Sequence, residues 1–360
     1  MLSVIVPTYN EAGNLPGLVR RLHSVLLDAS IDYELIIADD DSPDDTVRVC
    51  GELAAEYPLR LIVAADRPRD LSLSVIDGLR AARHDLIVVM DADLSHPPET
   101  IPSMVRHVDA NPDEMVVGSR YAAGGSFDRD WSLWRFANSH VATLLARPLV
   151  RCSDPMSGFF CFLKSRIVID DLRPIGYKIG LEIMVRGDFR RIEDMPIAFA
   201  DREIGHSKMN LEQQVRYLRH LRRLYLKKFG GFAEFIHFGV VGASGFIVDV
   251  SFYYFFQWLG IPHQVARGLS FWPAVSWNWA LNRQVTFGER ARRPRMRQWM
   301  EFVMASLVGF SINWGLYVLL TSNFAFFDEY RLIALITPIG VAAIFNFTLS
   351  SLFVYSNTRR

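Results

Sequence analysis

Residues 86–99 read LIVVMDADLSHPPE, and this stretch decides how the N-terminal part of the chain folds. The apolar run LIVVM predicts a fully buried strand, and the Pro-Pro pair that follows ends the strand and opens a helix at Glu99. Asp91 and Asp93 stand one residue apart where the strand ends. Two carboxylates at that spacing can share one divalent cation, and ligation by oxygen alone suits Mg²⁺ or Mn²⁺. An ordinary solvated turn can carry the same short motif, so its meaning depends on the rest of the chain.

Strand and helix patterns alternate from the first residue up to this stretch. Strands are predicted at residues 2–7, 34–39, 60–64 and 86–90, with helices near 14–29 and 46–56 and a third before residue 86. This order predicts an α/β sandwich with a mainly parallel sheet. Neither G-x-G-x-x-G nor a Walker sequence occurs, which argues against dinucleotide-binding and NTPase functions.

Polar clusters follow three of these strands. They read PTYNE at residues 7–11, DDDS at 39–42 and DAD at 91–93. Each cluster alone could be turn chemistry. Because ligands of such sheets gather at the carboxyl ends of the strands, the three together predict one binding site.

Composition divides the chain into two parts and names no partner by charge. The 39 basic and 39 acidic side chains cancel, and nucleic acid is not an expected partner. A length of 360 residues suggests two domains, and apolar and aromatic residues dominate after about residue 228. Cys50, Cys152 and Cys161 fit no disulfide framework or zinc spacing, and buried filler is favoured over a catalytic thiol. The chain begins with a strand, so no signal peptide is expected.

The second part contains four apolar segments, at residues 235–259, 265–287, 299–321 and 332–355. Each is long enough to cross a bilayer, which takes about 20 residues. Buried soluble helices are the alternative, but the charges cluster between the segments: residues 288–298 (GERARRPRMRQ) carry five arginines and the tail ends in two more. Both basic segments then fall on the side of the N-terminal domain. We therefore expect a multi-pass integral membrane protein whose catalytic domain is cytoplasmic.

The four segments also form an internal repeat. Residues 238–249 align with 302–313, which matches Gly245 to Gly309, and residues 277–279 (WNW) align with 345–347 (FNF). Asp249 and Asn313 fall at equivalent points inside predicted spans. Polar groups at such depth are costly, so they serve a function or bond each other or a backbone carbonyl; both interpretations stay open.

Seven motifs in order carry a family resemblance: VIVPTYNEAGNLP, IIADDDSPDDT, VVMDADLSHPPE, GSRYAAGG, DPMSGFF, GLEI and REIGHSK. Over residues 1–210 the chain resembles the family-2 inverting glycosyltransferases, in the branch of the dolichyl- or polyprenyl-phosphate mannose synthases. The apolar remainder resembles the GtrA-like membrane domain. The resemblance implies a GT-A-type nucleotide-sugar-binding sandwich at 1–210, an amphipathic interfacial helix and linker at 211–232, and an all-α four-helix transmembrane domain at 233–360.

The same resemblance assigns roles on the donor side. It places Pro7, Tyr9, Glu11 and Asp40 against the base and ribose, places Asp91, Ala92 and Asp93 against the metal and pyrophosphate, and closes Arg202 and Lys208 over the donor phosphates. Ser95 stands where mannose-type members often have Gln, and it is the expected third metal ligand. The loop at residues 65–78 lacks the glycine that the family commonly has near Asp70, so the loop leaves the donor less defined than the reaction.

On the acceptor side the resemblance gives Arg120, Arg135 and Ser139 the lipid phosphate, which suits guanidinium chemistry. A structural salt bridge is the alternative for Arg120. Asp154 would orient the acceptor or merely cap a turn, and Glu182 is equally open.

Two amphipathic helices are expected at the membrane surface. Arg135 and Ser139 belong to one, at residues 131–150. The other covers residues 211–229, where QQVRY approximates the Q-x-x-R-W of processive synthases with tyrosine in the last place.

The expected activity is inverting, metal-dependent transfer of mannose from GDP-mannose to a polyprenyl phosphate such as dolichyl phosphate. The lipid phosphate is already anionic near neutral pH, so no strong general base is needed. One alternative keeps the acceptor and uses UDP-glucose or another sugar nucleotide. A second is a translocase or scaffold for lipid-linked sugar with a nucleotide-binding domain. The oligomeric state stays open.

Overall fold

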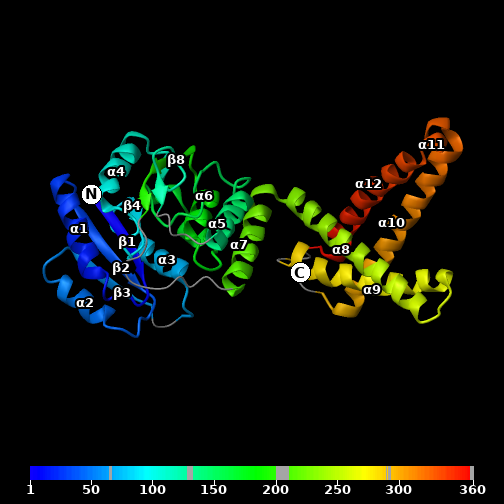
Figure 1. Cartoon of the computed structure of the whole chain (residues 1–360), viewed down its shortest axis with the longest axis horizontal. Helices are drawn as coiled ribbons and strands as arrows, with labels where there is room; N and C mark the ends of the chain where they lie inside the picture. The colour runs from blue at the N-terminus through cyan, green and yellow to red at the C-terminus, as the bar shows by residue number, and fades with distance from the viewer. Residues whose placement is uncertain (65–66, 128–132, 200–210, 289, 291–292, 357–360) are drawn as a thin grey trace. The chain divides into compact units, whose positions relative to one another are not determined.

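The computed structural model describes the chain except residues 65–66, 128–132, 200–210, 289, 291–292 and 357–360. The chain forms two compact units, Met1–Lys228 and Phe229–Arg360 (Figure 1).

The first unit is built on a seven-stranded sheet of order β3-β2-β1-β4-β7-β5-β8. The strands are β1 (Leu2–Thr8), β2 (Tyr33–Asp39), β3 (Leu59–Val63), β4 (Leu86–Val89), β5 (Glu114–Ser119), β7 (Phe160–Leu163) and β8 (Arg191–Pro196). All neighbours pair in parallel except β7, which runs antiparallel to both β4 and β5. The mainly parallel sheet is confirmed. Two short strands, β6 (Ser126–Phe127) and β9 (Ala198–Phe199), pair separately.

Helices cover both faces of this sheet (Figure 1). They are α1 (Leu15–Asp28), α2 (Thr46–Leu53), α3 (Leu71–Ala81), α4 (Ile101–Ala110), α5 (Leu133–Ala146), α6 (Ile179–Arg186) and α7 (Leu211–Phe229). Alternate strand residues point to opposite faces, so Ile5 packs with α3 and α6, whereas Val4 and Val6 pack with α1, α2 and α4. Burial on both faces explains why the strands read as continuous apolar runs.

Helix α7 is fastened to α5 by side chains that bond backbone carbonyls. The hydroxyl of Tyr217 donates to the carbonyl of Ala142 at 2.7 Å, and that of Tyr225 donates to Leu145 at 2.8 Å. Both carbonyls belong to the last two turns of α5, and that of Leu145 is among the last four, which accept no hydrogen bond within the helix. The two helices are therefore held side by side through polar as well as apolar contacts.

The second unit is helical. It comprises α8 (Gly231–Trp258), α9 (His263–Leu281), α10 (Arg295–Asn323), α11 (Ala325–Glu329) and α12 (Arg331–Leu349), with π-helical turns Asn282–Thr286 and Ser350–Val354 ending α9 and α12. Within the described residues, three helical stretches are long and apolar enough to cross a membrane: Gly231–Trp258, Arg295–Asn323 and Thr337–Val354. The predicted second span is a helix, α9, but it is not among those three; its crossing of the membrane stays a prediction.

The predicted repeat has matching contacts in the structure. Gly245 of α8 lies directly against the side chain of Asn278 in α9, and Gly309 of α10 lies in the same way against Asn346 in α12. Within the described residues, the Oδ1 atoms of both asparagines are buried without a hydrogen-bond partner.

Each repeat ends in a π-helical turn followed by an aromatic residue. These two residues, Phe287 and Tyr355, stack on each other with ring centroids 4.5 Å apart. Asp249, one of the polar residues predicted inside the spans, accepts a hydrogen bond from Ser270 of α9 at 2.7 Å.

Candidate active site

Three strand ends meet at one edge of the sheet, because β2, β1 and β4 are neighbours and run parallel. The chain turns sharply after each strand. Asn10, Asp41 and Leu94 have φ angles of 62°, 57° and 61°, in the left-handed region that side chains disfavour. Such strained turns cluster where a fold positions functional groups.

The aspartates that end β2 have different tasks. Asp39 accepts hydrogen bonds from the hydroxyl of Thr8 at 2.9 Å and from the backbone N–H of Ser42 at 2.8 Å, so it builds the turn. Asp40 instead faces Arg67, whose Nη1 donates to its carboxylate at 2.8 Å. Asp40, which the sequence predicts to contact the base and ribose, is thus paired with an arginine that the sequence motifs did not indicate.

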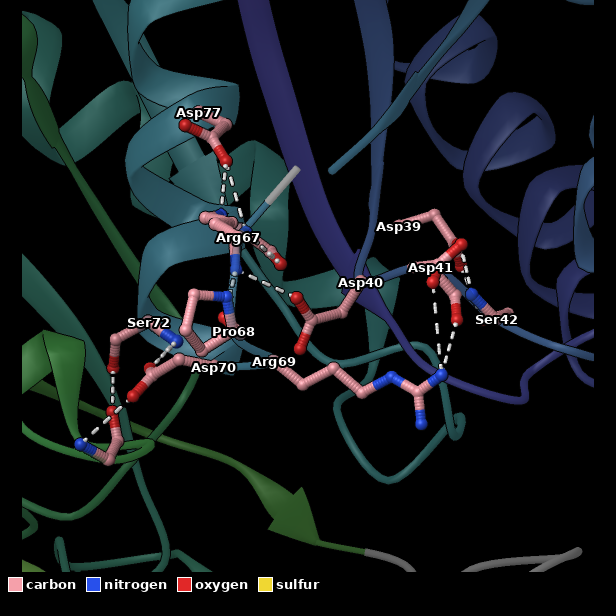
Figure 2. Close-up of polar contacts among 12 residues, drawn as sticks. Asp39, Asp40, Asp41, Ser42, Arg67, Pro68, Arg69, Asp70, Ser72 and Asp77 are labelled. Atoms are coloured by element: carbon pink, nitrogen blue, oxygen red, sulfur yellow. Dashed lines mark hydrogen bonds and ion pairs between the residues drawn. The ribbon is translucent and has the colours of Figure 1, made fainter. Parts of the chain in front are cut away.

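Figure 2 shows the loop that contributes this arginine. Arg67 also donates to Asp77 of α3, at 3.1 Å from Nε and 3.0 Å from Nη2, so the guanidinium is held from two sides. Arg69 donates to the hydroxyl of Tyr9 at 2.7 Å and lies 4.9 Å above the centre of its ring. The departure of residues 65–78 from the family pattern was the sequence signal for this loop.

The other two donor-side residues on β1 and its turn are placed as follows. Pro7 is buried within β1, opposite Ala38 of β2. Glu11 accepts a hydrogen bond from Asn14 at 2.7 Å, at the start of α1.

The end of β4 presents oxygen atoms suited to a hard cation. The side chain of Asp91 is 37% exposed, whereas Asp93 is buried, with 6% of the whole residue exposed, and accepts a hydrogen bond from the backbone N–H of Ser95 at 3.1 Å. The Ser95 hydroxyl is buried and has no hydrogen-bond partner among the described residues. Ala92 is buried between the two aspartates. Two carboxylates and an unsatisfied buried hydroxyl fit a site for Mg²⁺ or Mn²⁺.

The reversed direction of β7 brings another loop to the same edge. Phe160, the first residue of β7, pairs with Val89, the last residue of β4. The DPMSGFF segment that leads into β7 therefore lies beside the end of β4. Gly158 of this segment lies against the Asp91 carboxylate, and His96 accepts a hydrogen bond from the backbone N–H of Asp91. The sequence motifs indicated neither contact.

Arg120 and Asp154, both predicted near the acceptor, form one ion pair. Nε and Nη2 of Arg120 donate to the two carboxylate oxygens at 2.7 and 2.9 Å. Asp154 is fully buried and Arg120 largely so. Burial alone would lower the pKa of Arg120, but the hydrogen bonds and charge of Asp154 raise it. The salt bridge that was the alternative for Arg120 is therefore present, and it fixes the direction of the guanidinium.

Glu182 of α6 forms a buried polar contact with α7. Its buried carboxylate contacts Nε2 of His220 in α7 at 2.7 Å, accepts the backbone N–H of Arg173 at 2.8 Å and pairs with Arg186. Burial alone would raise the pKa of Glu182, but these partners lower it. The carboxylate thus ties α7 to α6.

The three cysteines are buried and unpaired, as expected of filler. Burial raises the pKa of Cys50 to about 12, which excludes a thiolate near neutral pH. Burial raises the pKa of Cys152 and Cys161 as well.

Part of the predicted site, namely Arg202 and Lys208, lies outside the described residues. Arg135 and Ser139 belong to α5, but their side chains are not described.

The fold and this edge of the sheet define a class, and comparison with known sequences agrees. Residues 3–173 match glycosyl transferase family 2, and residues 237–355 match the GtrA/DPMS transmembrane domain. The protein is therefore a glycosyltransferase of the GT-A-like fold joined to a membrane domain.

Its relatives narrow the class. The chain is 34% identical over 349 residues to the dolichol-phosphate mannosyltransferase of Pyrococcus furiosus, covering 96% of this chain and 97% of the relative. It is 40% identical over 237 residues to the enzyme of the same name from Mycosarcoma maydis, covering 63% and 80%. The chain belongs to the dolichol-phosphate mannosyltransferase family.

A solved structure of glucosyl-3-phosphoglycerate synthase from Mycobacterium tuberculosis, with Mn²⁺ and UDP, is 20% identical with a TM-score of 0.46. The match covers 63% of this chain and 79% of that one. So distant a similarity adds nothing to the family assignment.

Proposed function

We propose that this protein transfers mannose from GDP-mannose to a polyprenyl phosphate, with inversion and with the help of a divalent cation. The name of the relative that matches over nearly its whole length supports the sugar and the lipid. The observation that carries the chemistry is the turn after β4, which holds the carboxylates of Asp91 and Asp93 and the buried, unsatisfied hydroxyl of Ser95, whose backbone N–H donates to Asp93.

Asp91, Asp93 and Ser95 would hold Mn²⁺ or Mg²⁺ there. Bound cation supplies positive charge that offsets the charge developing on the diphosphate as the anomeric bond breaks. Arg202 and Lys208 would add their charges to the same phosphates. Tyr9 and Asp40 would face the base and ribose, with Pro7 and Glu11 shaping the turn beside them.

The acceptor side needs orientation more than activation. A lipid monophosphate is a competent nucleophile near neutral pH, so in-line attack on the anomeric carbon gives inversion when the phosphate is correctly placed. Arg120, held in direction by Asp154, would bind that phosphate together with Arg135 and Ser139 of α5. Planar guanidinium groups match phosphate oxygens bidentately.

The surface of α5 and α7 suits a lipid substrate. Val141 and Leu144 of α5 and Leu218 of α7 are each more than half exposed. Exposed apolar side chains beside a helix rich in arginine, as α7 is, are typical of contact with an anionic bilayer surface. The positive-inside rule places the arginine-rich sequence of residues 288–298 in the cytoplasm, and the catalytic domain would then work at the cytoplasmic face.

The test is transfer from a panel of radiolabelled sugar nucleotides to polyprenyl phosphate in detergent, with Mn²⁺, Mg²⁺ or EDTA. We expect transfer from GDP-mannose, loss of transfer in EDTA, and loss in the Asp91→Ala/Asp93→Ala variant. Transfer from UDP-glucose instead would replace the donor and keep the reaction. Folded protein that binds nucleotide but transfers no sugar would refute the synthase function and favour a translocase or scaffold.

A further inference from the structure

The two aspartates at the end of β4 differ in how exposed they are. Asp93 is buried and its carboxylate is fixed by the backbone of its own turn. The Asp91 side chain is 37% exposed, and an exposed side chain loses rotamer freedom when it is fixed on a ligand. A metal ligand that must be ordered anew at each binding event binds more weakly than one already held in place. The surroundings of Asp91 show how it is held.

His96 fixes the backbone of Asp91. Its Nδ1 accepts the Asp91 N–H at 3.1 Å and lies 3.7 Å from one carboxylate oxygen of the same residue. An accepting Nδ1 carries no proton, so the imidazole is in the tautomer protonated at Nε2. The ring is fully buried, stacked on Phe159 at 5.2 Å and in edge contact with Phe199 at 5.6 Å. The acceptor therefore has a fixed position.

Gly158 lies against the carboxylate group of Asp91 itself. A Cβ atom at this position would lie 3.0 and 3.1 Å from the two oxygens of Asp91. Gly158 is not among the glycines with positive φ, so its backbone conformation does not require glycine. The requirement is space: a Cβ at this position would force the Asp91 carboxylate to shift by a few tenths of an ångström.

We infer that His96 and Gly158 are positioning residues that set the direction of the Asp91 carboxylate toward the diphosphate-bound cation. The inference rests on the proposed function. It also connects the two halves of the site, because Phe199 contacts both His96 and Arg120, whose guanidinium lies 5.1 Å from the ring centre. Supporting groups behind a metal ligand typically alter metal affinity by 10- to 100-fold when removed, about the range expected here.

The experiment compares two substitutions of one residue. His96→Asn keeps an acceptor near the position of Nδ1 but loses the ring. His96→Phe keeps a ring that stacks on Phe159 but has no acceptor. The readout is the dissociation constant of Mn²⁺ for the full chain in detergent with GDP, measured by electron paramagnetic resonance. We expect about a tenfold or greater rise for His96→Phe and a rise of less than about threefold for His96→Asn. Turnover of His96→Phe should recover at high Mn²⁺.

Gly158→Ala tests the second residue, with Gly51→Ala of α2 as its control because nothing lies within 4 Å of a Cβ there. Gly158→Ala should weaken Mn²⁺ binding by about tenfold, and Gly51→Ala should not change it. Gly158→Ala also supplies the test if His96→Phe does not fold.

Two results would overturn the inference. One is unchanged Mn²⁺ affinity in both His96→Phe and Gly158→Ala. The other is equal weakening by His96→Asn and His96→Phe in proportion to lost thermal stability, which would mark a structural role alone. If the wild type binds no Mn²⁺ with GDP, the proposed function fails as well. If the wild type binds Mn²⁺ and transfers mannose while these variants match it, only the inference fails.

Discussion

The glycine–asparagine contacts of the membrane domain can be tested by adding one carbon atom. In Gly245→Ala, the new Cβ would lie far closer to the Asn278 side chain than 3.0 Å, a separation below which Cβ atoms are essentially never found. Gly309→Ala makes the same demand on Asn346 in the second repeat. Either the asparagine changes rotamer or the two helices move apart. We therefore expect both substitutions to destabilise the domain to a similar degree.

The magnitude follows from two opposing effects. Overpacking a close contact costs about 1–3 kcal/mol. Alanine is a better helix former than glycine by about 1 kcal/mol. The control glycines Gly242 of α8 and Gly315 of α10 have nothing within 4 Å of a Cβ. Their alanine variants show the helix effect alone and should match or exceed the wild type in stability. The difference between Gly245→Ala and Gly242→Ala then measures the contact.

The assay is unfolding of the detergent-solubilised chain at rising SDS mole fraction, followed by circular dichroism. In the double variant Gly245→Ala/Asn278→Ala the obstructing amide is absent, so most of the lost stability should return. Equal stabilities of Gly245→Ala and Gly242→Ala would refute the contact. A failure of Asn278→Ala to restore stability would refute the asparagine as its cause.

Three further variants test the catalytic unit. Ser95→Ala removes a buried hydroxyl that has no partner among the described residues, so the melting temperature should stay the same or rise. The affinity for Mn²⁺ should fall about tenfold. A Mn²⁺ titration that gives the wild-type affinity would show that Ser95 is not a metal ligand. Asp154→Asn breaks a buried ion pair, so the free energy of unfolding should fall by about 3 kcal/mol. In the same variant, KM for the lipid should rise while KM for GDP-mannose stays unchanged. Steady-state kinetics that show no selective rise in KM for the lipid would contradict the role of Arg120. Glu182 has a lowered pKa, so its stabilisation is present above the usual pKa of about 4.3 and is lost as pH falls through the folded-state pKa. The gap in melting temperature between wild type and Glu182→Gln should therefore be largest near neutral pH and shrink in acid, and a constant gap would argue against this linkage.

The fold could be predicted where periodicity is decisive. Continuous apolar runs separated by amphipathic segments specify parallel strands buried on both faces, and β1 to β4 are where the sequence indicates. The antiparallel insertion of β7 could not be predicted, since FCFL reads equally well in either direction. Whether the second predicted span crosses the membrane is harder to predict, because the sequence of α9 contains Arg267 and Asn278 among its apolar residues. Hydropathy alone does not separate such a helix from a buried soluble one.

The candidate site shows the same division. Strand ends and carboxylate spacing place Asp40, Asp91 and Asp93 at one edge, because local sequence determines where a strand stops. Which partner each side chain takes depends on residues distant in sequence. Arg67 reaches Asp40 from 27 positions away, and Arg120 reaches Asp154 from 34. Such pairings need the tertiary structure, as does the distinction between Asp39 and its neighbour.

The direction of β7 has a consequence for the order in which the protein matures. A ribosome releases the strands β1 to β4, whose ends form this edge of the sheet, well before it releases the segment that leads into β7. Gly158, against which the Asp91 carboxylate lies, is made 67 residues after Asp91, so this contact cannot form until then. Long-range closures of this kind form late in folding because the loop between them must first be ordered. We therefore expect a nascent chain that ends near residue 125 to acquire β-structure yet to bind Mn²⁺ poorly. The ability to bind Mn²⁺ would then appear once β7 has been made, and ribosome-stalled chains of graded length would show that step.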